Sequence, residues 1–140
     1  MVGLSETRRP GSGATSSKGF TYYWSGMNDG HHVKGVAIGV SSKLQPSIVE
    51  VTPVDERIMQ LSLKHSIGFL SVAAVYAPTK VCETEEKEMF YAKLDSVLNQ
   101  CDAFIVLGDF NAVTDTERSG YKLCVGPYDS GTRNDNSSFL

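Results

Sequence analysis

The chain has no long apolar run and no secretory leader, and both shortages exclude classes of protein. None of its apolar stretches approaches the roughly 20 residues that a membrane-spanning helix needs. The N-terminus lacks the charged-then-apolar pattern of a signal peptide. We therefore expect an intracellular protein that makes no contact with membranes.

Cysteine is also scarce. Cys82, Cys101 and Cys124 are odd in number and follow no recognisable spacing. Disulfide frameworks use even, patterned sets of cysteines, and structural zinc sites use closely spaced Cys or His pairs. The sequence predicts neither a disulfide-linked partner nor a zinc site.

Basic charge is not in excess, because 13 Lys and Arg stand against 16 Asp and Glu, giving a net charge of -3. The chain therefore has no overall positive field of the kind that attracts nucleic acids. A local basic rim remains compatible with this balance, and Arg8, Arg9 and Lys18 form a small basic loop. A length of 140 residues with 41% hydrophobic content fits one domain with one core.

The order of apolar segments predicts a layered α/β domain. Small residues dominate 9–18, which we interpret as a loop. The chain becomes polar after Asn111, so residues 112–140 are expected to be mostly loop. The segments expected to form strands are 2–5, 20–24, 33–40, 48–51, 57–63, 66–76 and 104–107.

One helix is predicted over residues 83–100. Acidic residues crowd its first turn, where the helix dipole favours negative charge. Apolar residues recur at helical spacing and predict a stripe that packs into the core. The stripe consists of Met89, Phe90, Leu94, Val97 and Leu98.

The strongest local signal is the apolar run Phe104–Leu107, which ends abruptly in Gly-Asp-Phe-Asn. Such a run predicts a fully buried strand, and ligands of open α/β sheets bind outside the carboxyl ends of strands. Asp109 and Asn111 at this position suit a hydrated divalent metal or a phosphate oxygen. The alternative is an ordinary strand-to-loop turn, where Gly, Asp and Asn are common.

Two further residues stand at predicted strand ends. Glu6 follows Val2–Ser5, and Tyr76 precedes Ala77-Pro78, whose proline keeps its neighbour extended. If these strands lie side by side, Glu6 and Tyr76 converge with Asp109 and Asn111 on one rim. The alternatives are a solvated glutamate and a tyrosine that only packs.

This set of residues suits the hydrolysis of a phosphodiester. That reaction needs a Lewis acid, an oriented water and stabilisation of charge on the phosphate. Mg²⁺ takes one or two carboxylates and keeps several waters. Glu6 would hold the metal, and the Tyr76 hydroxyl would contact the phosphate. Asp109 would take or hold the proton of the attacking water, and Asn111 would orient that water.

Three ordered motifs also resemble a known family. They are Ser5-Glu6-Thr7-Arg8, Val75-Tyr76-Ala77-Pro78-Thr79 and Leu107-Gly108-Asp109-Phe110-Asn111-Ala112. They are similar to successive motifs of the endonuclease/exonuclease/phosphatase superfamily, which includes apurinic endonucleases and the endonucleases of LINE-type retrotransposons. Segments 21–26, 44–57 and 89–94 further resemble the craniofacial development protein 2-like group, whose endonuclease domain derives from a retrotransposon.

The resemblance implies two packed β-sheets flanked by helices and a nuclear enzyme that cleaves DNA phosphodiesters with Mg²⁺ or Mn²⁺. By motif, Glu6 and Asp109 would bind the metal. Tyr76, Asp109 and Asn111 would be the catalytic residues.

The chain departs from the family pattern at both ends. The family's first strand and helix and its final Ser-Asp-His-type motif have no counterpart, so residues 1–140 are expected to be a partial domain that lacks the C-terminal strands. We expect weak or no activity, since loss of one transition-state donor costs about a hundredfold in rate. A non-catalytic binding module and a phosphatase acting on a small substrate are the alternatives.

Overall fold

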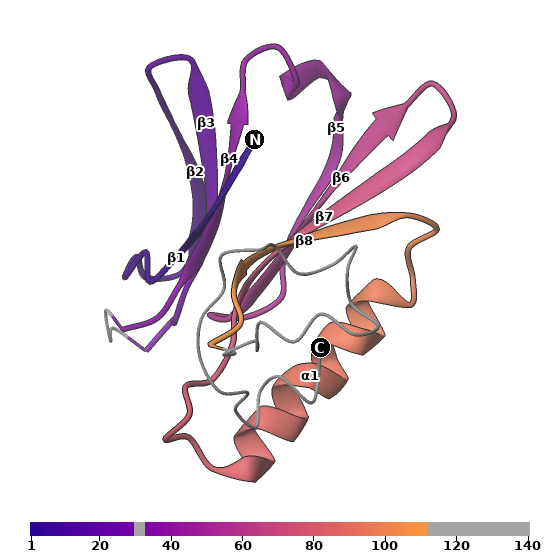
Figure 1. Cartoon of the computed structure of the whole chain (residues 1–140). Helices are drawn as coiled ribbons and strands as arrows, with labels where there is room; N and C mark the ends of the chain where they lie inside the picture. Colours follow the sequence, from indigo (N-terminus) through magenta and orange to yellow (C-terminus); the bar gives the residue numbers. More distant parts are fainter. Residues whose placement is uncertain (30–32, 112–140) are drawn as a thin grey trace, which may run out of the picture.

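The structure, a computed structural model, describes residues 1–29 and 33–111, which form two four-stranded sheets and one long helix (Figure 1). Sheet A has the strand order β1-β4-β3-β2, and sheet B has the order β5-β6-β7-β8. The elements are β1 (Val2–Ser5), β2 (Ser12–Ser17), β3 (Phe20–Ser25), β4 (Val36–Ser41), the 3₁₀ turn η1 (Gln45–Ser47), β5 (Ile48–Pro53), β6 (Ile58–His65), β7 (Gly68–Tyr76), α1 (Thr84–Leu98) and β8 (Phe104–Asp109).

The two sheets pack face to face through their apolar inner surfaces. Alternate residues of a strand point to the same face, so every second residue of β4 and of β6 enters this core. The architecture is mixed α/β, mostly strands, and is compatible with the predicted sandwich. The buried residues of this core are Val36, Ile38, Val40, Met59, Leu61, Leu63, Val72 and Ala74.

Helix α1 covers the other face of sheet B, where Phe90 and Leu94 pack against Ile58 and Val75. The prediction that Met89 belongs to this stripe is wrong, because its side chain is 69% exposed. Successive residues of a helix are 100° apart around its axis. The buried face of α1 contains Lys87, Phe90 and Leu94, and Met89 lies outside it. Lys87 reaches out of the core by donating from Nζ to the Lys80 carbonyl at 3.1 Å.

Strand β8 is parallel to β7, to which α1 connects it. The prediction of a fully buried strand is wrong, because no residue of β8 is buried and Phe104 and Ile105 are 50% and 47% exposed. Within the described residues β8 forms the edge of sheet B, so a neighbour covers it on one side only. Val106 and Leu107 are partly buried against the two cores.

The prediction of a loop over 9–18 is also wrong. Residues 12–17 form β2, which pairs with β3 along its whole length. Gly13 is required by the packing, because a Cβ there would fall 2.5 Å from the Trp24 ring. The glycine at this position therefore reflects close contact with an aromatic neighbour.

The expected side-by-side arrangement of the site-bearing strands is correct for β7 and β8 and wrong for β1. Strand β1 is antiparallel to β4 in sheet A, so Glu6 approaches Tyr76 across the sandwich from the opposite sheet. We call this edge of the molecule, where β1, β7 and β8 end, the site end. The opposite edge carries the β2–β3 and β6–β7 turns, and we call it the hairpin end (Figure 1).

The predicted loop over 112–140 lies outside the described residues. His65 is the last residue of β6, directly before the β6–β7 turn. In the parts of the chain that the structure covers, no helix combines the length and apolar character needed to cross a bilayer.

Candidate functional site

Tyr76 and Glu6 are in direct contact between the two sheets. The Tyr76 hydroxyl donates to Glu6 Oε1 at 2.8 Å, although 70 residues separate them in the chain. This hydrogen bond, then partial burial and the nearby carboxylates of Glu6 and Asp109, raise the pKa of Tyr76 above its ordinary value of 10.0, against the lowering effect of Arg57. The phenol is therefore a protonated hydrogen-bond donor at neutral pH.

Glu6 stands on a turn that sheet A holds firmly. The backbone N–H of Thr7 donates to the Gly35 carbonyl at 3.1 Å, and that of Arg8 donates to the Lys34 carbonyl at 2.8 Å. Glu6 itself has a φ of +52°, a left-handed conformation that non-glycine residues rarely adopt. Gly35 is required here, because its φ is +107° and a Cβ would fall 2.5 Å from Thr7 Oγ1.

Asp109 is the last residue of β8 and lies opposite Tyr76 in the parallel pairing of β7 with β8. The pairing continues past the strands, since the Ala77 N–H donates to the Asp109 carbonyl at 2.8 Å. Gly108 makes this close approach possible. Its φ is +150°, and a Cβ there would collide with the backbone of Val75.

Asn111 closes the turn that follows Asp109. Its N–H donates to Asp109 Oδ1 at 2.8 Å, and its Nδ2 donates to the Ala77 carbonyl at 2.7 Å. Its φ of +49° is one that asparagine tolerates better than most residues. The amide that the sequence assigned to orienting water therefore also fixes the loop that presents Asp109.

The structure thus brings all four predicted residues to one place. Glu6 contacts Tyr76, Tyr76 pairs with Asp109, and Asp109 accepts from Asn111. The basic residues Arg8, Arg9 and Lys18, however, do not lie together. Arg8 lies 3.7 Å from Glu6, and Arg9 stacks 4.6 Å from the centre of the Trp24 ring. Lys18 is at the β2–β3 turn of the hairpin end, so the three do not form one rim.

The oxygen donors of this site are of the chemical type that a hydrated hard cation prefers. Glu6 and Asp109 present carboxylates at a solvent-exposed edge, and the Glu6 side chain is 52% exposed. Residues 1–29 and 33–111 contain no group of three or more His, Cys, Asp or Glu side chains placed to hold a metal. Two carboxylates with several waters are the usual environment of Mg²⁺, so Glu6 and Asp109 would hold it with water completing the shell.

A set of charged residues behind this site is absent from the sequence predictions. Arg57 is buried with its side chain 9% exposed, and its Nη1 donates to the Tyr76 carbonyl at 3.0 Å. Glu86 of α1 accepts from Arg57 Nη2 at 2.6 Å. An arginine at the start of an apolar strand, directly after Asp55-Glu56, was the signal that could have identified it.

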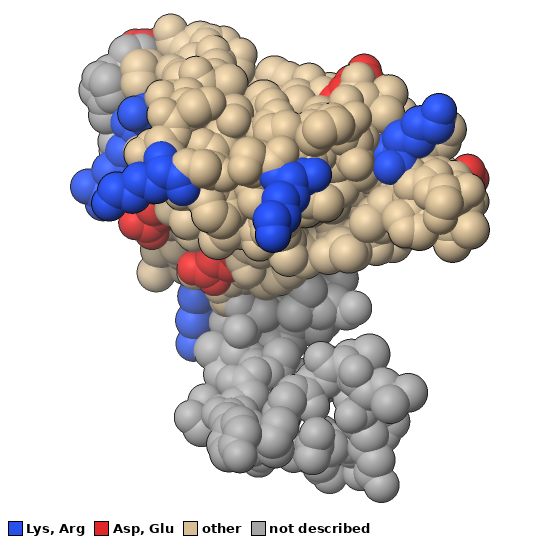
Figure 2. All heavy atoms as spheres, turned by 90° about the horizontal axis from the view of Figure 1, so that it is seen from above, with Lys and Arg blue, Asp and Glu red and all other residues tan. Residues whose placement is uncertain are grey.

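The hairpin end offers no comparable concentration of charge. Figure 2, which views the molecule from that side, shows Lys and Arg side chains at separate places with mostly uncharged surface between them. A scattered distribution of this kind agrees with the net charge of -3.

Comparison with known proteins gives two matches and no family model. No protein-family model matches the chain. It is 29% identical over 115 residues to "Craniofacial development protein 2" of Tragulus javanicus and 28% identical over 115 residues to the protein of that name from Bos taurus. The match covers 80% of this chain, but the chain spans only about a fifth of the length of these relatives, 20% and 19%. The chain is therefore similar, over most of its length, to one segment of craniofacial development protein 2.

Proposed function

We propose that this chain carries the metal- and phosphate-binding edge of a Mg²⁺-dependent phosphodiesterase that acts on DNA in the nucleus. The observation that carries the proposal is the 2.8 Å hydrogen bond between Tyr76 and Glu6, which joins two predicted site residues from opposite sheets. The pairing of Tyr76 with Asp109 supports it. The resemblance to retrotransposon-type endonucleases supports the choice of reaction and substrate in this proposal.

Each residue has a defined task in this proposal. Glu6 and Asp109 hold the cation, which when bound supplies Lewis-acid stabilisation of the phosphate charge. The Tyr76 hydroxyl is kept protonated by its surroundings. Its single proton, donated to Glu6 Oε1 in this structure, would turn to a non-bridging phosphate oxygen once Glu6 holds the cation and substrate is bound. Asp109 holds the proton of the attacking water, and Asn111 keeps the Asp109 loop in place.

A nicking assay tests the proposal. Supercoiled plasmid is incubated with the chain and Mg²⁺, with EDTA and the Asp109→Ala variant as controls. We expect relaxed circles that depend on both the metal and Asp109. Nicking that survives EDTA or the substitution would contradict the proposal, and the turnover rate would measure the expected weakness of this chain.

Two alternatives are outcomes of companion experiments. Titration with Mg²⁺, compared with Glu6→Gln, tests metal binding directly; no binding that depends on Glu6, together with retention of DNA, would favour a non-catalytic module. Hydrolysis of a phosphoinositide in preference to abasic DNA would favour a phosphatase.

A further inference from the structure

Arg57 connects the back of the site to Tyr76 by several contacts. Its Nη1 donates to the Tyr76 carbonyl at 3.0 Å, and its own carbonyl accepts from the Tyr76 N–H at 2.8 Å. The guanidinium carbon lies 5.5 Å from the centre of the Tyr76 ring. The backbone and the ring of Tyr76 are therefore both held by this one residue.

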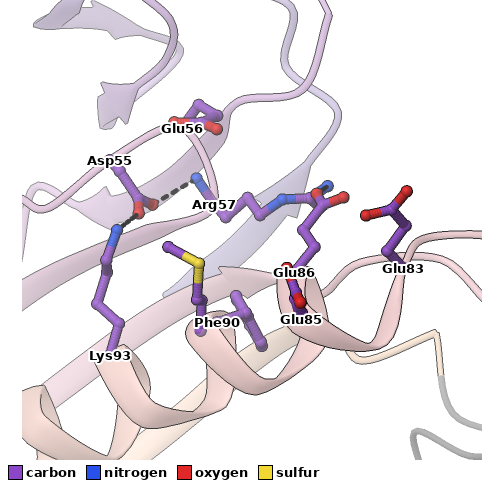
Figure 3. A pocket seen from close by; sticks show the side chains of 9 residues that line it. Asp55, Glu56, Arg57, Glu83, Glu85, Glu86, Phe90 and Lys93 are labelled. Atoms are coloured by element: carbon purple, nitrogen blue, oxygen red, sulfur yellow. Dashed lines mark hydrogen bonds and ion pairs between the residues drawn. The ribbon is translucent and has the colours of Figure 1, made fainter.

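Glu86 fixes the guanidinium from helix α1, as Figure 3 shows. Arg57 Nη2 donates to Glu86 Oε1 at 2.6 Å, and Lys34 Nζ lies 3.9 Å from the same oxygen. Partial burial works to raise the pKa of Glu86, but the hydrogen bond and charge of Arg57, with Lys34, outweigh it and lower the pKa below its ordinary 4.5. Glu86 is thus an ionised anchor at neutral pH.

The same group of residues also holds the Glu6 turn. The Gly35 N–H donates to the Glu56 carbonyl at 3.0 Å, and Lys34 Nζ lies 3.7 Å from Glu56 Oε1. Lys34 and Gly35 are the residues whose carbonyls accept from Arg8 and Thr7. Adjacent residues, Glu56 and Arg57, therefore support Glu6 on sheet A and Tyr76 on sheet B.

We propose that Arg57, held by Glu86, is a positioning residue that sets the separation between Glu6 and Tyr76 across the sandwich. Its effect on metal binding and cleavage rests on the proposed function, whereas its effect on the geometry of Tyr76 does not. Arginine is needed because a planar guanidinium can bond Glu86 and the Tyr76 carbonyl at once, and the single ammonium of lysine cannot reproduce that fork.

Lys93 provides a matched control in the same pocket (Figure 3). Its Nζ donates to Asp55 Oδ2 at 2.6 Å, the same distance as the Arg57–Glu86 bond, and it also joins α1 to the loop before β6. The Asp55 carboxylate otherwise accepts from the N–H groups of Arg57 and Ile58. Removal of this cation disturbs the same helix without touching Tyr76.

The test uses 3-fluorotyrosine-labelled protein and ¹⁹F NMR, with Tyr76→Phe to assign the Tyr76 signal. In Arg57→Lys we expect that signal to shift or broaden, and in Lys93→Met to stay in place. If Arg57→Lys does not fold, Glu86→Gln replaces it, since the Glu86 side chain is 43% exposed and the change is isosteric. A Tyr76 signal that stays at its wild-type position in the folded variant overturns the proposal.

Steady-state nicking supplies the second readout. We expect Arg57→Lys to lower kcat by about tenfold to a hundredfold, as loss of outer-shell partners does, with KM for DNA within about twofold. Equal losses in Arg57→Lys and Lys93→Met would overturn the positioning role. If wild type neither binds Mg²⁺ nor nicks while the NMR signal moves as expected, the proposed function fails and the positioning role stands.

Discussion

At the site end of the sandwich, hydrogen bonds join loops of the two sheets, whereas at the hairpin end β2–β3 and β6–β7 each close on a short turn. Gly35 and Ser25 of sheet A bond the carbonyls of Glu56 and Asp55, at 3.0 and 2.6 Å. At the hairpin end, Ile67 is 92% and Phe69 57% exposed. Hydrogen bonds therefore join the loops of the two sheets at the end where the predicted site residues meet.

Backbone conformation shows the same contrast. Of the five non-glycine residues with positive φ in the described chain, Lys18 lies at the hairpin end, in a two-residue turn that requires it. The other four are at the site end, and each such residue costs about 1–3 kcal/mol. Hydrogen bonds of Thr7, Arg8 and Asn111 hold the backbone around them. These residues are Glu6, Arg8, Lys34 and Asn111.

The largest expected effect compares the two ends of one strand. Asp109→Asn at the site end should lower Mg²⁺-dependent nicking by about a thousandfold, because the amide cannot hold the proton of the attacking water. Asp102→Asn, just before β8 begins, should leave the rate within twofold. Asn keeps an oxygen that can accept from the Asn111 N–H, so circular dichroism should match wild type. Similar losses of nicking rate in both variants would mean that removing a negative charge lowers the rate wherever that charge lies.

A glycine pair tests the packing contrast. Gly108 and Gly68 have similar φ values, +150° and +141°, but a Cβ at Gly108 meets Val75 and one at Gly68 meets nothing. Gly108→Ala should therefore cost about 3–5 kcal/mol, strain plus collision, and Gly68→Ala about 1–2 kcal/mol from strain alone. Urea denaturation measures both. Equal costs would show that β8 can move away from β7 without penalty.

Much of this arrangement could be predicted from local sequence. The apolar runs located the helix and seven of the eight strands in residues 1–29 and 33–111 to within a few residues, because apolar segments have clear periodicity. Abrupt changes from apolar to polar residues marked the strand ends at Asp109 and Tyr76. Strand β2 was missed because its small polar residues resemble a loop, and its pairing partner β3 is not identified by any local pattern.

The relative placement of the strands could not be read in the same way. Which sheet receives β1 depends on pairings between residues far apart in the chain, such as Leu4 with Ala37, and no local pattern encodes them. Arg57 was missed for the same reason, since its partners come from the end of β7 and from α1. The burial of Phe104 was overestimated because an apolar run does not reveal whether its strand lies at an edge.

Two tyrosine-to-phenylalanine variants test the role of a single hydroxyl group at the site end. Tyr76→Phe removes the donor to Glu6 and should lower nicking by about ten- to a hundredfold, through loss of a hydrogen bond to the phosphate. Tyr22→Phe, in mid-strand on β3, should leave the rate unchanged. Metal titration separates the causes. A tenfold weaker Mg²⁺ affinity in Tyr76→Phe would show that the hydroxyl acts by orienting Glu6 instead.

The smallest effect is a pH dependence that belongs to the site end. The pKa of Glu86 is lowered on folding, so its contribution to stability is present above the ordinary value of 4.5 and is lost as pH falls through the lowered value. Since its side chain is 43% exposed, we expect this contribution to the free energy of unfolding to be less than about 1 kcal/mol.

Glu86→Gln should therefore be less stable than wild type at pH 7 by this amount, and the difference should shrink from about pH 5 downward. Urea midpoints at pH 7, 5, 4 and 3 measure it, with Glu50→Gln on β5 as the control. A difference that persists unchanged to pH 3 would mean that Glu86 stabilises the fold by shape and not by its charge on Arg57.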